Sequence, residues 1–117
     1  MAIAIEDFGG RYRRYSEAGS ANTELSVTTP TGAHSRVLYT TTAYSAAPTQ
    51  AGVTHVLDSG VGAAYDSTWS TGTANAQFTV FQPTAKLVLD NGDAFKVTAP
   101  AGGVGITAAV VIVVELL

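Results

Sequence analysis

The sequence predicts an all-β protein: an antiparallel β-sandwich of about seven strands with an extended N-terminal arm. Three observations predict this class. Short segments alternate between apolar and polar residues, and Gly, Pro and small polar residues separate them. No window places apolar residues at helical spacing. Many short strands joined by turn signals are typical of jelly-roll or immunoglobulin-like sandwiches.

The strands follow from the alternation, and the turns between them set their limits. With 117 residues, the chain can bury a core in one domain without disulfides or metals. We expect residues 1–22 to form the arm and residues 23–117 the sandwich, with a large loop at 59–73. The expected strands are residues 23–29, 35–43, 53–58, 76–82, 86–90, 94–99 and 106–116.

One connection can be predicted to the register. Residues 90–92 are Asp-Asn-Gly, and a three-residue loop with the glycine in the left-handed conformation makes a hairpin of the flanking strands. This loop pairs Leu87 with Phe95. Leu87, Leu89, Phe95 and Val97 then share one buried face.

The last strand is apolar on both faces. Residues 106, 108, 110, 112 and 114 form one face and residues 109, 111 and 113 the other. An outer face of a sandwich is usually polar. Either this strand is covered on both sides within its own fold, or a neighbouring subunit covers it.

The arm holds half of the six basic residues within four positions, interleaved with tyrosines: Arg11, Tyr12, Arg13, Arg14 and Tyr15. Arg and Tyr are enriched at protein interfaces, so we expect these five residues to contact a partner subunit. Two other interpretations are a plain surface segment and a grip on nucleic acid through phosphates and stacking. The patch is small and carboxylates flank it, which argues against nucleic acid.

Composition and motifs exclude most chemistry. Only 13% of residues are charged, the net charge is −3 and cysteine is absent, so a thiolate metal site is excluded. His34 and His55 have no metal-ligand spacing and are expected to be ordinary surface or core residues. The nucleophile elbow and phosphate-loop motifs are absent. We therefore expect neither an enzyme nor a cofactor.

Two smaller possibilities concern the loops. The aspartate pairs Asp90/Asp93 and Asp58/Asp66 could bind calcium, but neither supplies the ligands of a calcium loop, and turn chemistry explains the first pair. The loop at 59–73 carries Tyr65 and the only tryptophan, Trp69. Trp69 either anchors a sugar or a partner, or closes the end of its own sandwich.

We expect neither a secretory signal nor a membrane-spanning helix in the given sequence. Its first residues lack the basic region of a secretory signal. The longest apolar run, residues 106–114, is too short for a spanning helix, which needs about 20 residues. We expect no membrane partner.

Several segments resemble small virion structural proteins of tailed bacteriophages. They are Tyr44–Thr49, Leu57–Gly60 with Gly62–Asp66, and the run Asn91–Thr107, which combines a Gly-Asp turn, a strand and a small-residue glycine loop. The resemblance covers roughly residues 35 to 115. It implies a non-enzymatic sandwich present in many copies on a particle, and that family has no catalytic residues to transfer.

Together with the resemblance, these expectations predict a function. We expect a capsid decoration (cement) protein that binds the major capsid protein or other virion subunits, forms homo-oligomers, and reaches the virion by assembly in the host cytoplasm. The alternative is a carbohydrate- or receptor-binding module of a head fibre or tail appendage, with Trp69 and Tyr65 in its site. Neither hypothesis involves nucleic acid or a membrane.

Overall fold

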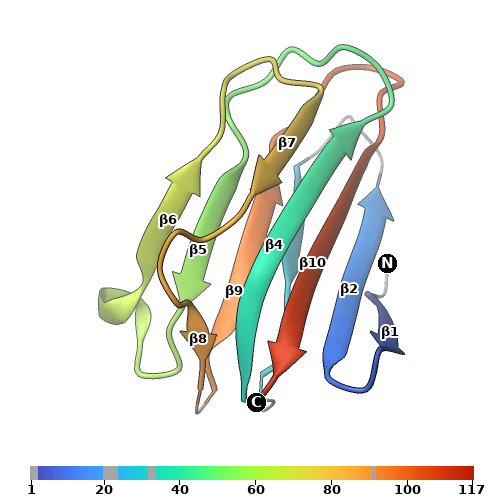
Figure 1. Ribbon diagram of the computed structural model, residues 1–117. Coiled ribbons are helices and arrows are strands. Elements are labelled where there is room, and N and C mark those ends of the chain that lie inside the picture. The colour runs from blue at the N-terminus through green and yellow to red at the C-terminus, as the bar shows by residue number, and fades with distance from the viewer. Residues whose placement is uncertain (1–2, 20–23, 32–33, 91) are drawn as a thin grey trace.

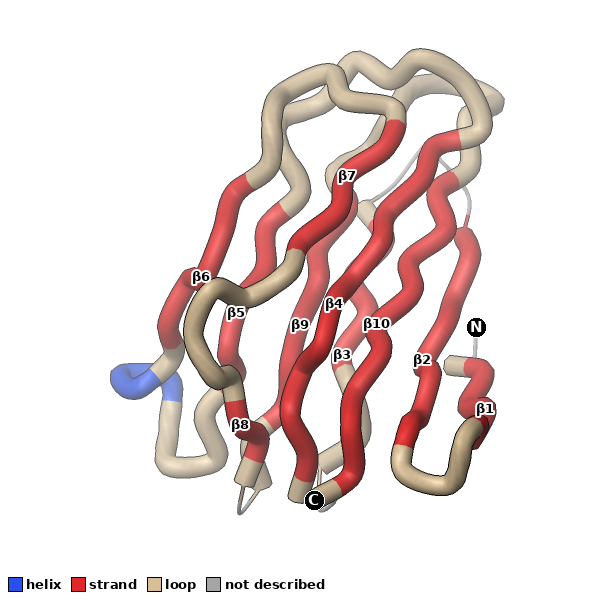
Figure 2. The backbone as a smooth tube through the Cα atoms, in the orientation of Figure 1, coloured by secondary structure: helices blue, strands red, loops and turns tan. Residues whose placement is uncertain are grey.

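The computed structural model describes residues 3–19, 24–31, 34–90 and 92–117, which form two β-sheets packed face to face (Figures 1 and 2). All pairings between described strands are antiparallel. The predicted class, an antiparallel β-sandwich, is confirmed.

The two sheets differ in size. Sheet A has the strand order β1 (Ala4–Phe8), β2 (Tyr12–Gly19), β10 (Ala108–Leu116), β4 (Ser35–Tyr44) and β7 (Phe78–Phe81), and the short β8 (Val88–Leu89) also pairs with β4. Sheet B has the order β3 (Leu25–Thr28), β9 (Ala94–Ala99), β5 (Thr54–Asp58) and β6 (Ser67–Thr71). A short 3₁₀ helix, η1 (Ala63–Tyr65), precedes β6. Each of the seven predicted strands overlaps an observed strand.

The predicted N-terminal arm is wrong. Residues 4–19 form the β1–β2 hairpin, and β2 pairs with β10 over eight residue pairs (Figure 1). Gly9 and Gly10 make the turn possible because both have positive φ, 60° and 74°. Tyr15 lies opposite Ile112 and is only 3% exposed. This segment therefore belongs to sheet A.

The loop predicted at residues 59–73 contains a strand. Ser67–Thr71 forms β6, the edge of sheet B, and pairs with β5 across a register shift at His55/Val56. Its sequence, Ser-Thr-Trp-Ser-Thr, has a single apolar residue. Without apolar alternation, the pairing with β5 is what makes this segment a strand.

The turn at residues 90–93 joins the two sheets and does not close a hairpin. Gly92 has a φ of 87°, as predicted, and the Asp93 amide donates to the Asp90 carbonyl over 2.9 Å. However, β8 pairs with β4 of sheet A, whereas β9 pairs with β3 and β5 of sheet B. The predicted pairing of Leu87 with Phe95 is wrong.

The buried face predicted for these two segments is nevertheless confirmed. Leu87, Leu89, Phe95 and Val97 are all at most 3% exposed. A chain that crosses from one layer to the other still directs the same alternate side chains inward, so the buried face does not depend on the pairing. Phe81 of β7 joins the layers: its ring lies 5.9 Å from that of Phe95.

Candidate functional site

β10 lies in the middle of sheet A, between β2 and β4, and has two unequal faces. Val110 and Ile112 point into the sandwich and are fully buried. Ala109 is exposed and Val111 is half-buried on the opposite face, where no described strand forms a further layer (Figure 1). The protein's own fold therefore covers one apolar face of this strand and leaves the other partly open.

The open face extends over the whole sheet. We define the outer face of sheet A as the outward-pointing side chains that the strand registers place side by side: Ala4, Glu6 and Phe8 of β1, Tyr12, Arg14, Ser16 and Ala18 of β2, Ala109, Val111, Val113 and Glu115 of β10, Arg36, Tyr39, Thr41 and Ala43 of β4, and Phe78 and Val80 of β7. Its middle is built from small residues. Ala18, Ala109 and Ala43 are consecutive neighbours across three strands.

Large apolar side chains surround this middle. Phe78 is 60% exposed and Val80 58% at one margin, and Phe8 and Tyr12 are 42% and 37% exposed at the other. Tyr39 is 40% exposed beside β10. These are five of the ten exposed large hydrophobic side chains of the described residues. Exposed apolar side chains gathered on one face indicate an interaction surface.

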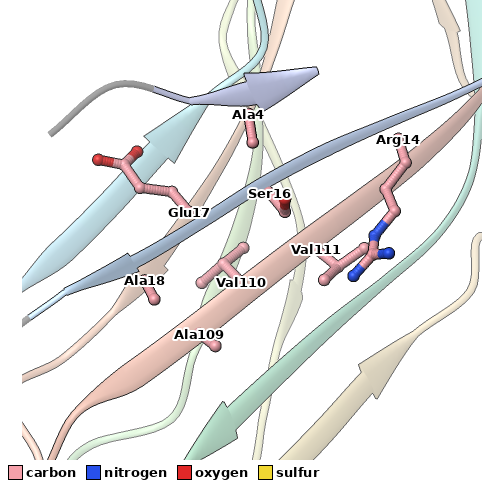
Figure 3. Close-up of a pocket in the computed structure, with 8 residues that line it drawn as sticks. All are labelled: Ala4, Arg14, Ser16, Glu17, Ala18, Ala109, Val110 and Val111. Atoms are coloured by element: carbon pink, nitrogen blue, oxygen red, sulfur yellow. The ribbon is translucent and has the colours of Figure 1, made fainter. Parts of the chain in front are cut away.

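The small residues leave open depressions on this face. The first, of about 350 Å³, lies over β2 and β10 (Figure 3). Its lining residues are Ala4, Arg14, Ser16, Glu17, Ala18, Ala109, Val110 and Val111. A second depression, of about 360 Å³, shares Arg14 and Val111 and reaches Phe8 and Tyr39. The outer face therefore has relief that another protein surface can fill.

The arginines of the predicted contact segment pair with the chain's own carboxylates. Arg13 Nε lies 2.6 Å from Asp7 Oδ1, and this hydrogen bond holds the pKa of the Asp7 carboxyl below its usual range. Arg14 lies 3.9 Å from Glu6. Arg11 lies 3.4 Å from Glu115.

Glu115 also binds Arg36 at 3.0 Å and is only 15% exposed. The cationic cluster seen in the sequence is thus largely neutralised within the fold.

The two tyrosines of that segment have different environments. Tyr15 belongs to the core, so its side chain offers no surface to a partner. Tyr12 stays on the outer face, with its ring stacked on Phe8 at a centroid distance of 5.9 Å. Of the five predicted contact residues, Tyr12 and Arg14 are the ones that the strand registers place on the outer face.

Tyr65 and Trp69, the other predicted contact residues, lie on η1 and β6, at the β6 edge of sheet B. Tyr65 is 66% exposed on η1. Trp69 on β6 is half-buried and packs against the core. This packing agrees with the interpretation that Trp69 closes its own sandwich.

Two of the four aspartates considered for calcium, Asp93 and Asp66, accept hydrogen bonds from backbone amides. Asp93 accepts hydrogen bonds from the amides of Gly60 at 2.9 Å and Asp90 at 3.1 Å. Asp66 accepts one from the Ser59 amide at 2.8 Å. Within the described ranges, no group of three or more His, Asp or Glu residues could hold a metal ion.

The two histidines are one surface and one core residue. His34 Nδ1 lies 3.2 Å from Asp90 Oδ1, with both side chains about half exposed. His55 is fully buried, its ring stacked on Phe81 at 4.7 Å. Its Nδ1 lies 3.4 Å from the Ser70 carbonyl oxygen, and burial lowers the pKa of His55.

Sequence reasoning missed the contributions of β1, β4 and β7 to the outer face. A signal existed at β7, because Phe78 and Phe81 place aromatic rings on opposite faces of one strand. It was not decisive, since only the pairing with β4 shows that Phe78 and Val80 face outward beside Ala43 and Thr41.

Comparison with known proteins adds no family assignment. The chain matches no protein-family model, and no curated protein matches it.

In the part of the chain that the structure describes, no helix has the length and apolarity needed to cross a membrane.

Proposed function

We propose that this chain is a non-enzymatic structural subunit that binds other protein subunits through the outer face of sheet A, and that it does so as a decoration protein on a tailed-phage particle. The observation that carries the proposal is the apolar, charge-paired outer face. The resemblance of residues 35–115 to virion structural proteins supports the particle as the setting.

The size of the outer face suits a subunit contact. Five strands about 4.8 Å apart, with β10 about 30 Å long, give a face on the order of 500 to 700 Å². A standard interface buries about 800 Å² on each partner. One such contact is therefore modest in area.

The charge distribution suits a desolvated contact as well. An unpaired charge is costly to bury, and interface cores are poor in charged residues. On the outer face, Glu6 and Arg14 form an ion pair with each other. The rows through Ala109 and Val111 contain no charged residue. Removing water from these rows when a partner binds therefore costs little electrostatic energy.

A charge at the centre of the face tests the contact. Val111→Arg places a guanidinium in the middle of the outer face and is expected to abolish binding to the particle. Val104→Arg is the matched control, because Val104 is 93% exposed and lies outside this face. Co-sedimentation with purified particles measures binding, and circular dichroism checks folding. Normal binding of a folded Val111→Arg variant would overturn the outer-face contact.

Copy number tests the particle as the setting. We expect hundreds of copies of this chain in particles purified from cells that carry its gene, measured by quantitative mass spectrometry against the major shell protein. Six or twelve copies would indicate a portal, connector or tail ring and would overturn decoration. Absence of the chain from the particles would overturn the virion role.

A further inference from the structure

β7 forms an edge of sheet A that no described strand covers. It pairs with β4 on one side only. Its two outward side chains, Phe78 and Val80, are 60% and 58% exposed. An uncovered edge with large apolar side chains presents both hydrogen-bonding groups and hydrophobic surface for another strand.

The register with β4 shows which backbone groups face this free edge. The Tyr44 amide donates to the Gln77 carbonyl over 2.9 Å, so Tyr44 and Gln77 form a hydrogen-bonded pair. Hydrogen-bonded and non-hydrogen-bonded pairs alternate in an antiparallel ladder. Thr79 and Phe81 therefore bond to β4, and the N–H and C=O groups of Phe78 and Val80 point away from it.

We propose that β7 pairs with β7 of a second copy of this chain, antiparallel, with Thr79 facing Thr79 across a two-fold axis perpendicular to the sheet. This axis keeps the inner face of each sheet inside and its outer face outside. Phe78 of each copy then forms a hydrogen-bonded pair with Val80 of the other. Each such pair sets an aromatic ring against a β-branched side chain, a stabilising cross-strand combination.

Charge favours this edge for contact between copies. The chain carries a net charge of −3, so two copies repel each other overall. A contact between them is least opposed at a surface that carries no charged residue. No charged residue occurs between Asp66 and Lys86. β7 can therefore approach its own copy without a like-charge contact along the strand.

The other described edges are less suited to this pairing. β1 carries Glu6 and Asp7, which is a common protection of edge strands. β6 has a register shift in its ladder and no exposed large apolar side chain. β3 has four residues, with Leu25 half-buried and Val27 buried.

The pairing goes beyond the proposed function and is independent of it. It joins sheet A of two copies into one continuous sheet and places their outer faces side by side. A subunit bound to the particle through the outer face would then have twice the contact area per assembly. The purified chain in solution, without the particle, is sufficient to test the pairing itself.

A charge swap tests both the pairing and its register. Phe78→Lys and Val80→Glu are each expected to raise the dimer Kd by roughly tenfold or more, because each variant places two charges against apolar side chains. The double variant faces each lysine with a glutamate of the other copy and is expected to restore the dimer. Sedimentation equilibrium at up to about 100 µM detects a Kd in the micromolar range.

Controls separate the edge from the outer face. Val104→Lys and Val111→Arg are expected to leave the dimer intact, since Val104 is outside sheet A's outer face and Val111 lies on the central strand. A monomeric wild-type chain, dimers in both single variants, or a double variant that stays monomeric would each overturn the proposal. None of these outcomes affects the test of particle binding through Val111.

A cross-link gives a second measurement that does not depend on weakening the dimer. The chain has no cysteine, and residues in a facing non-hydrogen-bonded pair have Cα atoms about 4.5 Å apart, within disulfide range. Thr79→Cys is expected to form a disulfide-linked dimer on mild oxidation. Val61→Cys, at a site 75% exposed, is the control and should remain monomeric. Equal cross-linking of the two variants would overturn the register.

Discussion

Tyr15→Ala tests whether the N-terminal hairpin is part of the folding unit. Tyr15 is 3% exposed and belongs to the core. Truncation of a buried aromatic side chain costs about 3 to 5 kcal/mol. A domain of this size loses roughly 4 °C in Tm for each kcal/mol, so we expect Tm to fall by about 10 to 20 °C. Thermal unfolding followed by circular dichroism or calorimetry measures the change.

Tyr12→Ala is the matched control in the same hairpin. Its side chain is 37% exposed and stacks on Phe8, so we expect a loss of about 1 kcal/mol or less. Deletion of residues 1–22 should be far more damaging, because it removes the strand that pairs with β10 over eight residue pairs. A Tyr15→Ala variant that melts within a few degrees of the wild type, or a stable deletion variant, would refute this prediction. Residues 1–22 would then be an arm that the sandwich does not need for folding.

Three further predictions concern the rest of the sandwich. Burial lowers the pKa of His55 below its ordinary value of about 6.5, so the unfolded chain binds the proton more readily and the free energy of unfolding falls as pH drops below about 6.5. Urea titrations at several pH values measure the free energy of unfolding as a function of pH. Its fall at low pH should be smaller in His55→Gln than in the wild type and unchanged in His34→Gln. An equal fall in both variants would contradict this prediction. Trp69→Ala should cost about 1 to 3 kcal/mol in thermal unfolding because the half-buried ring packs on the core, and an unchanged Tm would contradict that packing. Gly52→Ala should prevent stable folding, because the new Cβ would collide with the Gly72 carbonyl oxygen; a soluble variant with native thermal stability would refute the close approach.

Local pattern was sufficient for most of the strands. The seven expected segments alternate or are continuously apolar, and a strand with period-two alternation specifies its buried face whatever its neighbours are. The β1–β2 hairpin and β6 escaped because they lack such a pattern. β2 has one buried residue, Tyr15, and β6 has one apolar residue, Trp69.

The candidate contact residues show the same division. The sequence located the arginine and tyrosine cluster but could not show that Arg11, Arg13 and Arg14 meet carboxylates of the chain itself. One of these partners, Glu115, is about a hundred residues away, and the other two depend on a hairpin turn. Which charges remain available to a partner is therefore a property of the folded chain.

By itself, the sequence determined the class of fold, the buried face of most strands, the turn at Gly92 and the apolar character of both faces of the last strand. All of these depend on neighbours within a few residues. Only the tertiary structure decided which strands pair, that β8 and β9 lie in different sheets, and that the outer face of sheet A and the β7 edge are open. These depend on contacts between distant segments, because alternation assigns a side chain to a face and says nothing about the strand beside it.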